Sequence, residues 1–222
     1  MTAMTGTEAA SAARGARRIA LWGLLGAALL AVAVAALLQG AWRESGGEPP
    51  PVLGVAPSFL LTERSGDVFT TAELAGSPWV ADFIFTRCGG VCPRMTSVMR
   101  GLRAEVRERF GAAAARFVSV SVDPEHDTPA VLADYAAAYG IEGDDWLFLT
   151  GGPAEIQRLV QQGFKLGHDP DAAPGSAEPI LHATRFVLVD GEGRIRGYYD
   201  PFESRDVGRL LEDLGTLGER PE

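Results

Sequence analysis

The sequence is poor in the residues that usually carry metal and redox chemistry, because its 222 residues include only two cysteines and three histidines. It has no internal repeats, and basic residues are scarce. After the first 42 residues, which hold three arginines and one glutamate, 17 basic and 28 acidic residues remain, a net charge of −11. This balance argues against nucleic acid or an anionic membrane surface as a ligand. It fits simple solubility or a cationic partner.

The N-terminal part contains a long apolar run without charges. Residues 1–18 form a polar tail that ends in arginines, and Ile19 to Leu38 carries no charged residue. As a helix, these twenty residues cover about 30 Å, the hydrocarbon thickness of a bilayer. We therefore expect a transmembrane anchor over residues 19–42, with Trp42 at the interface. A cleaved signal peptide is the alternative, although its apolar region is usually shorter, about 7–15 residues.

The charges before this run predict its orientation. Arg14, Arg17 and Arg18 precede it, and positive residues favour the cytoplasmic side. We expect a single-pass protein of a bacterial-type inner membrane, with its N-terminus cytoplasmic and its soluble domain periplasmic or otherwise extracytoplasmic. The Arg17-Arg18 pair has little support as a twin-arginine signal. No cysteine follows the span closely, which argues against a lipid-anchored cysteine there.

The rest of the chain divides into a linker, a domain and a short tail. Residues 43–57 are rich in Gly and Pro and should form an extended tether. The folded domain should cover residues 58–217, and residues 218–222 a tail. Hydrophobic periodicity and turn residues predict its elements. Strands are expected at 58–62, 67–70, 79–86, 116–122, 145–150, 164–167, 181–190 and 194–199, and helices at 71–74, from 93, and at 129–139, 153–162 and 205–217.

This order of elements predicts an α/β architecture, with a mixed central sheet flanked by helices on both faces. Cys88 and Cys92 lie at the turn between a buried strand and the helix that starts near Pro93. A helix N-terminus favours thiolate over thiol, and Arg87 adds a nearby cation. The pattern looks like a thioredoxin-like fold, although thioredoxins usually have two residues between their cysteines, where this chain has three.

The spacing allows both sulfurs to meet at one point, where they could share a metal or join as a disulfide. Two buried core cysteines are the simpler alternative. The Gly89-Gly90 pair between them, at a strand-to-helix junction, makes that alternative less convincing.

Four motifs together resemble the Sco/SenC family of copper-binding assembly factors. They are F-x-F-T-R-C-x-x-V-C-P at 83–93, V-S-V-D-P-E-x-D-T-P at 120–129, L-T-G at 149–151, and His182 before the last hairpin. The resemblance covers most of residues 57–217 and implies copper ligation by Cys88, Cys92 and His182. The family commonly has a Pro-Asp pair where this chain has Gly89-Gly90, so a carboxylate beside the site is missing.

The ligand chemistry agrees with that implication. Thiolate sulfur selects Cu(I), and two thiolates with one imidazole suit a three-coordinate Cu(I) site, while imidazole also helps retain Cu(II). His182 precedes the last hairpin, near the place where thioredoxins carry a cis-proline. His126 and His168 are expected in solvated loops.

The remaining candidates in the sequence are structural first. Asp123 and Asp127 could steady the site as hydrogen-bond acceptors or cap the helix at Pro129, and Asp127 is expected to be mostly structural. Met95 and Met99 have helical spacing and are expected in the core.

Two functions follow from these residues. The resemblance implies a membrane-tethered copper metallochaperone that helps to assemble the binuclear copper site of cytochrome c oxidase. Its expected partners are subunit II of the oxidase, a copper-donor chaperone and a thiol reductant. The alternative is a thiol-disulfide oxidoreductase that uses Cys88 and Cys92 on an exported protein, so enzymatic activity stays open. His182 discriminates between the two, because disulfide exchange does not need it. A third alternative is a redox or copper sensor, but no feature of the sequence indicates it.

Overall fold

The computed structural model describes residues 48–164 and 184–218. The predicted tail 1–18 and anchor 19–42 lie outside this range, as do His168, His182 and residues 219–222. Among the helices in the described ranges, none has the length and apolar character needed to cross a bilayer.

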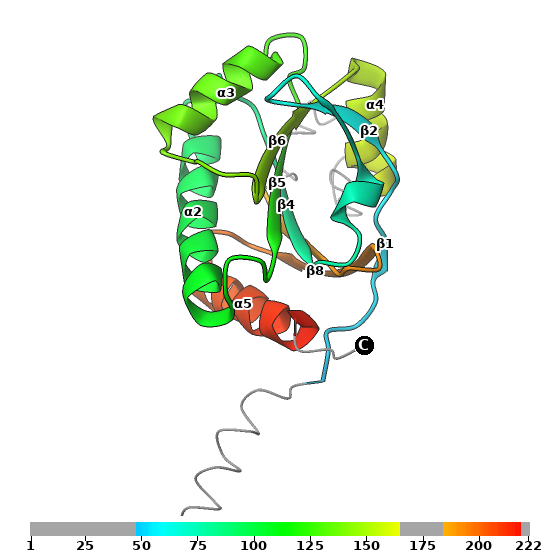
Figure 1. The fold of residues 1–222 in the computed structure, drawn as a ribbon, viewed down its shortest axis with the longest axis vertical. Coiled ribbons are helices and arrows are strands. Elements are labelled where there is room, and N and C mark those ends of the chain that lie inside the picture. The colour runs from blue at the N-terminus through cyan, green and yellow to red at the C-terminus, as the bar shows by residue number, and fades with distance from the viewer. Residues whose placement is uncertain (1–47, 165–183, 219–222) are drawn as a thin grey trace, which may run out of the picture. The chain divides into compact units, whose positions relative to one another are not determined.

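The core of the domain is an eight-stranded mixed sheet in the order β1-β8-β7-β4-β5-β6-β2-β3 (Figure 1). The strands are β1 (Gly54–Val55), β2 (Leu60–Glu63), β3 (Val68–Thr70), β4 (Trp79–Ile84), β5 (Arg116–Ser121), β6 (Trp146–Thr150), β7 (Phe186–Val189) and β8 (Arg194–Tyr199). β4, β5 and β6 are parallel, while the other pairs are antiparallel. The mixed sheet and its two outer hairpins agree with the prediction.

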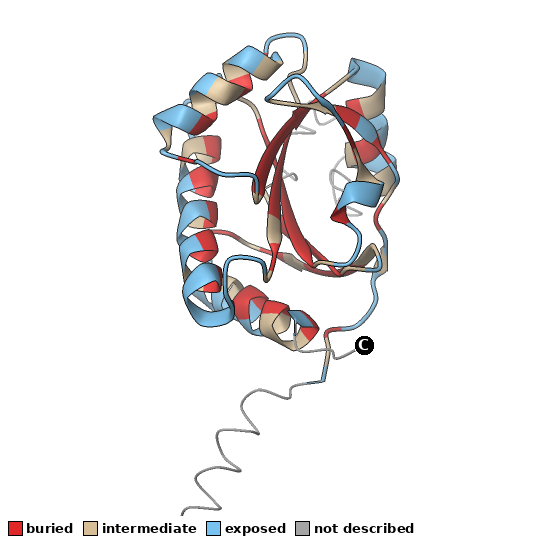
Figure 2. Ribbon diagram, in the orientation of Figure 1, coloured by how far each residue is buried: buried red, intermediate tan, exposed pale blue. Residues whose placement is uncertain are grey.

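Helical segments cover both faces of the sheet. They are η1 (Thr71–Leu74), α2 (Val91–Phe110), α3 (Pro129–Ala138), α4 (Pro153–Arg158), the π-helical segment η2 (Leu159–Gly163) and α5 (Ser204–Gly218). Residues of α2, α3 and α5 share one hydrophobic cluster, and residues of η1, α4 and η2 share the other. The sheet is therefore the middle layer, and its central strands are buried (Figure 2).

Strand β4 connects the two layers because its side chains alternate between them. Val80 and Ile84 belong to the cluster with α2, while Ala81 and Phe83 belong to the other cluster. All six residues of β4 are buried. A strand buried on both faces reads as a nearly continuous apolar run, which explains why the sequence predicted it well.

The domain begins earlier in the chain than the sequence predicted. Residues 54 and 55, assigned to the tether, form β1 and pair with β8, with Gly54 opposite Ile195. The N–H of Leu53 donates to the carbonyl of Ile195 at 2.8 Å. The prediction of an extended backbone holds for these residues, but they are not part of a free tether. An extended segment beside an open sheet edge can complete its hydrogen bonds as a strand.

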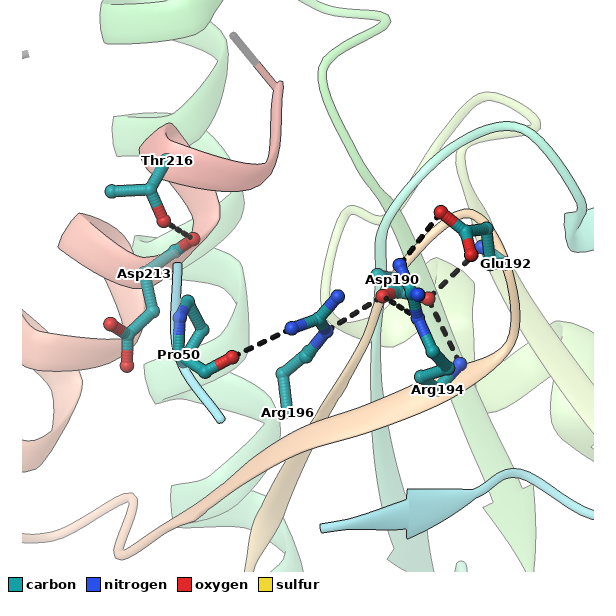
Figure 3. A network of polar contacts seen from close by, with 7 residues as sticks. All are labelled: Pro50, Asp190, Glu192, Arg194, Arg196, Asp213 and Thr216. Atoms are coloured by element: carbon teal, nitrogen blue, oxygen red, sulfur yellow. Dashed lines mark hydrogen bonds and ion pairs between the residues drawn. The ribbon is translucent and has the colours of Figure 1, made fainter. Parts of the chain in front are cut away.

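A buried ion pair strengthens this attachment (Figure 3). The Nε of Arg196 donates to Asp190 at 2.6 Å, and its Nη1 donates to the carbonyl of Pro50 at 2.7 Å. Arg194 also pairs with Asp190, at 2.8 Å. Val189, next to Asp190, lies opposite Trp79, the first residue of β4. The chain is therefore held at the amino end of β4, opposite to the end that leads to the cysteines.

Candidate functional site

The two cysteines lie where β4 leads into α2. The helix begins at Val91, with Gly90 as its N-cap, so Cys92 is in the first helical turn. The N–H of Cys88 donates to the carbonyl of Phe85 at 3.1 Å, which closes a tight turn before the helix. The N–H of Cys92 then donates to the sulfur of Cys88 at 3.5 Å. Because Gly90 has no side chain to cap the helix, the Cys88 sulfur takes up one of its free N–H groups.

The two thiols have different surroundings. Both are free in this structure; Cys88 is partly exposed, whereas Cys92 is only 2% exposed. Burial works against ionisation of Cys88, but hydrogen bonds from the N–H groups of Cys92, Gly90 and Val91 and from the Cys92 thiol outweigh it, so the pKa of Cys88 lies below its usual value. Burial and the neighbouring Cys88 raise the pKa of Cys92 to about 12. Cys88 is therefore the more accessible and the more acidic thiol, and Cys92 is the less acidic thiol behind it.

The helix N-terminus accounts for the lowered pKa of Cys88, as the sequence predicted. The predicted cation beside it is engaged elsewhere. Arg87 is largely exposed and donates from Nε and Nη2 to Asp123, at 2.9 and 2.5 Å. Its contribution is to join residues 85–90, the cysteine loop between β4 and α2, to the loop after β5.

Asp127 holds the same two loops together from inside. It is fully buried and accepts hydrogen bonds from the N–H of Thr86 at 3.0 Å, from the Thr86 hydroxyl at 2.5 Å and from the Ser121 hydroxyl at 2.6 Å. Thr86 lies two residues before Cys88. Thr128, not Asp127, caps α3, with its hydroxyl accepting from Val131 at 3.4 Å. Of the two roles considered for Asp127, the structure therefore shows the acceptor that steadies the cysteine loop.

The histidines fall into two groups. His126 is exposed in the loop after β5, as expected, and only its backbone takes part in that turn, donating to Asp123 at 3.0 Å. His168 and His182 lie outside the described residues. Within the described ranges, no three side chains of His, Cys, Asp or Glu are grouped closely enough to hold a metal ion.

Strand β7 begins four residues after His182, and its direction fixes where residues 184 and 185 lie. β7 is antiparallel to β4, with Ala81 opposite Val187 and Trp79 opposite Val189. The residues just before Phe186 therefore lie toward the carboxyl end of β4, the end that carries the cysteine loop. Met95 and Met99, the other sulfur candidates, are 1% and 0% exposed and belong to the core beneath α2.

Asp82 was not recognised as notable from the sequence. It is 0% exposed in the middle of β4, and neither carboxyl oxygen has a hydrogen-bond partner of ordinary length among the described residues. Burial raises its pKa to about 7, and the hydroxyl of Ser119, its neighbour on β5, offsets this only in part. The signal was present, because Asp82 is the one acidic residue inside an apolar run.

Comparisons with known proteins agree with this geometry. The profile of the SCO1/SenC family matches residues 49–217. The SCO1 protein homolog of Bacillus subtilis is 32% identical over 158 residues, which cover 70% of this chain and 79% of that protein.

Solved structures have the same fold. A SCO1/SenC family lipoprotein from Bacillus anthracis is 29% identical, with a TM-score of 0.67 over 78% of this chain and all of that one. Yeast Sco1 with copper bound, 24% identical, has a TM-score of 0.57 over 72% of this chain and 87% of that one. The cysteine loop, the thioredoxin-like sheet and the matched profile lead to one conclusion: this chain belongs to the SCO1/SenC family.

Proposed function

We propose that this chain is a membrane-tethered copper metallochaperone. It carries Cu(I) on Cys88, Cys92 and His182 and delivers it to the binuclear copper site of cytochrome c oxidase, with subunit II as the acceptor. Residues 19–42 anchor it in a bacterial-type inner membrane, so that the domain works outside the cytoplasm. Its further partners outside the cytoplasm are a copper-donor chaperone and a thiol reductant.

The observation that carries this proposal is the hydrogen bond from the N–H of Cys92 to the sulfur of Cys88. It brings the second cysteine to the first within one helical turn, at the helix end that favours thiolates. Two adjacent sulfurs are soft ligands that select Cu(I). The exposed Cys88 gives an incoming ligand access to the ion, which transfer by ligand exchange requires.

The direction of β7 supports His182 as the third ligand. The chain reaches β7 from the end of the sheet where the cysteine loop lies, and His182 is four residues before Phe186. An imidazole beside two thiolates completes a three-coordinate site for Cu(I) and would also help to retain Cu(II).

A second function, thiol-disulfide exchange, has its own support in the different pKa values of the two thiols. The Cys88 thiolate would attack a partner disulfide, forming a mixed disulfide and releasing one partner sulfur as a thiolate. Cys92, after losing its proton, would then attack Cys88, form the Cys88–Cys92 disulfide and release the partner as a dithiol. This step would leave the partner's cysteines reduced, as copper loading requires.

Copper titration of the full-length chain separates the two functions. Under reducing conditions, we expect one Cu(I) per chain, with binding abolished in Cys88→Ser and Cys92→Ser and weakened at least tenfold in His182→Ala, because each change removes one of three ligands. His126→Ala and His168→Ala are the matched controls and should bind as the wild type does. Wild-type stoichiometry and affinity in His182→Ala would defeat the three-ligand carrier and leave disulfide exchange.

A further inference from the structure

A groove lies along the surface shared by α2 and α5, and one of its ends is next to Cys92 in the sequence. Its volume is about 840 Å³. Pro93 and Arg94, which directly follow Cys92, line one end, while Arg109 and Glu212 line the other. From Arg94 to Arg109 the helix rises about 22 Å, the length of six or seven residues of extended chain.

The lining between the charged residues is largely apolar, with Ser97, Ser204 and Tyr139 as its other polar side chains. Val98 of α2 and Phe202, Val207 and Leu211 of the α5 side line it, and Leu211 is 3% exposed. Gly208 forms part of the wall, and a Cβ atom placed on it would meet no atom within 4 Å. Residue 208 therefore borders open space that a larger side chain would occupy.

The two ends of the groove carry opposite charges. The guanidinium of Arg94 lies over the ring of Phe202, 4.3 Å from its centroid, and no carboxylate pairs with it within the described part of the chain. Arg109 is neutralised by Glu105, with which it forms an ion pair. Glu212 at the far end has no cationic partner among residues 48–164 and 184–218. The cysteine end is thus positive and the far end negative.

This arrangement is typical of a protein-binding surface. Arginine and aromatic residues over an apolar floor are the side chains that contribute most to interfaces, and a guanidinium stacked on a ring keeps its edge N–H groups free for a carboxylate. A partner segment with a negative residue for the cysteine end and a positive residue for the far end would be attracted to the groove. The same charges would fix the direction in which the segment binds.

We propose that this groove docks the protein that accepts copper from Cys88, through a segment that carries a carboxylate, then apolar side chains, then a basic residue. The carboxylate binds Arg94, the apolar side chains occupy the floor beside Gly208, and the basic residue faces Glu212. This orientation brings the residues before the carboxylate to Cys88. The inference rests on the proposed function, since it assigns the docking surface for the same site.

The test measures copper transfer from the Cu(I)-loaded full-length chain, in detergent, to the reduced copper-binding domain of cytochrome c oxidase subunit II. Arg94→Glu reverses the charge at the cysteine end, and Gly208→Leu fills the groove without a clash at Cβ. We expect each to slow transfer roughly tenfold at limiting partner concentration while one Cu(I) stays bound. Raising the salt concentration should slow the wild type and have less effect on Arg94→Glu.

Two substitutions outside the groove are matched controls. Arg205→Glu makes the same charge reversal at an exposed position of α5, and Ala137→Leu enlarges an exposed small residue of α3. Both should transfer copper within twofold of the wild type.

Each outcome decides one question. Wild-type transfer in both groove variants overturns the docking surface and leaves the metallochaperone intact, whereas absence of Cu(I) binding by the wild type defeats the proposed function itself. If sedimentation shows that Arg94→Glu and Gly208→Leu change only self-association, the groove is a contact between two copies of this chain, and the inference is wrong.

Discussion

Asp127 accepts two hydrogen bonds from Thr86, one from its N–H and one from its hydroxyl, two residues before Cys88. The carboxylate belongs to the loop after β5, so the position of the cysteine loop depends on a residue about forty positions away in the sequence. A third bond, from Ser121, orients the carboxylate itself.

Replacing Asp127 should therefore affect both folding and the cysteines. Asp127→Ala leaves three donors without their acceptor, two on the half-buried Thr86 and one on the buried Ser121, and we expect a loss of about 2–4 kcal/mol in the free energy of unfolding. Cu(I) affinity should also fall, because the loop with Cys88 is no longer held. Urea denaturation and copper titration measure the two effects. Asp123→Ala removes the more exposed pair with Arg87 and should cost under about 1 kcal/mol; equal losses in both variants would contradict this division.

The two cysteines should react at different rates. With iodoacetamide at pH 7 and under reducing conditions, we expect Cys88 to be alkylated at least tenfold faster than Cys92, because it is the more exposed thiol and its pKa is lowered while that of Cys92 is raised. Mass spectrometry of the peptide that contains both sites measures this order. Faster labelling of Cys92 would show that the thiolate is assigned to the wrong sulfur.

Gly90 gives a way to change the pKa of Cys88 without touching either sulfur. A Cβ atom at this position meets no atom within 4 Å, so there is room for a side chain. Gly90→Asp places a carboxylate at the N-cap, where it competes for the N–H groups that stabilise the Cys88 thiolate and repels its charge. We expect the pKa of Cys88 to rise and its alkylation at pH 7 to slow several-fold.

Gly90→Asn is the matched control for that change. It caps the helix with the same shape but adds no charge, so its effect on alkylation should be smaller than that of Gly90→Asp. If the two variants behave alike, competition for the N–H groups and not charge controls the pKa of Cys88.

The buried carboxyl of Asp82 should make stability fall as pH rises. Its pKa is raised from 3.8 to about 7, so between these values the folded chain keeps a proton that the unfolded chain releases. The free energy of unfolding should therefore decrease from pH 4 to 7, by about 2–3 kcal/mol between pH 5 and 7, and change little above pH 7 from this group. Urea denaturation of the wild type and Asp82→Asn across this range measures the difference.

Asp82→Asn should remove this slope, so its stability relative to the wild type should improve as pH rises. Asp134→Asn, which changes an exposed carboxyl of α3, controls for the general effect of lost charge and should leave the slope in place. A constant difference between Asp82→Asn and the wild type from pH 5 to 8 would mean that Asp82 is ionised in the folded chain throughout.

Arg196 should hold the start of the domain. Arg196→Ala removes the donor to Pro50 and one of the two arginines on Asp190. We expect a loss of about 2–4 kcal/mol in the free energy of unfolding, together with faster proteolysis of residues 48–56. Arg194→Ala is the comparison, since it contacts the same carboxylate but is 28% exposed and does not bind Pro50. Equal protease sensitivity in the two variants would contradict a specific role for Arg196.

The sequence by itself determined most of the central elements and the place of the two cysteines at a strand-to-helix turn. β4 and α2 have strong local signals, an apolar run and a 3.6-residue period, and local signals do not depend on the rest of the chain. The two cysteines, with the D-P-E-x-D-T-P motif, were sufficient to indicate the family.

Only the tertiary structure decided which residues far apart in the sequence meet. The strand at Gly54–Val55, the bond from Arg196 to Pro50 and the bonds from Thr86 to Asp127 join segments tens of residues apart or more. The unequal pKa values of Cys88 and Cys92 likewise come from burial and hydrogen bonds that arise on folding. Spacing in a sequence places residues along one element, whereas packing between elements sets their partners, their exposure and therefore their reactivity.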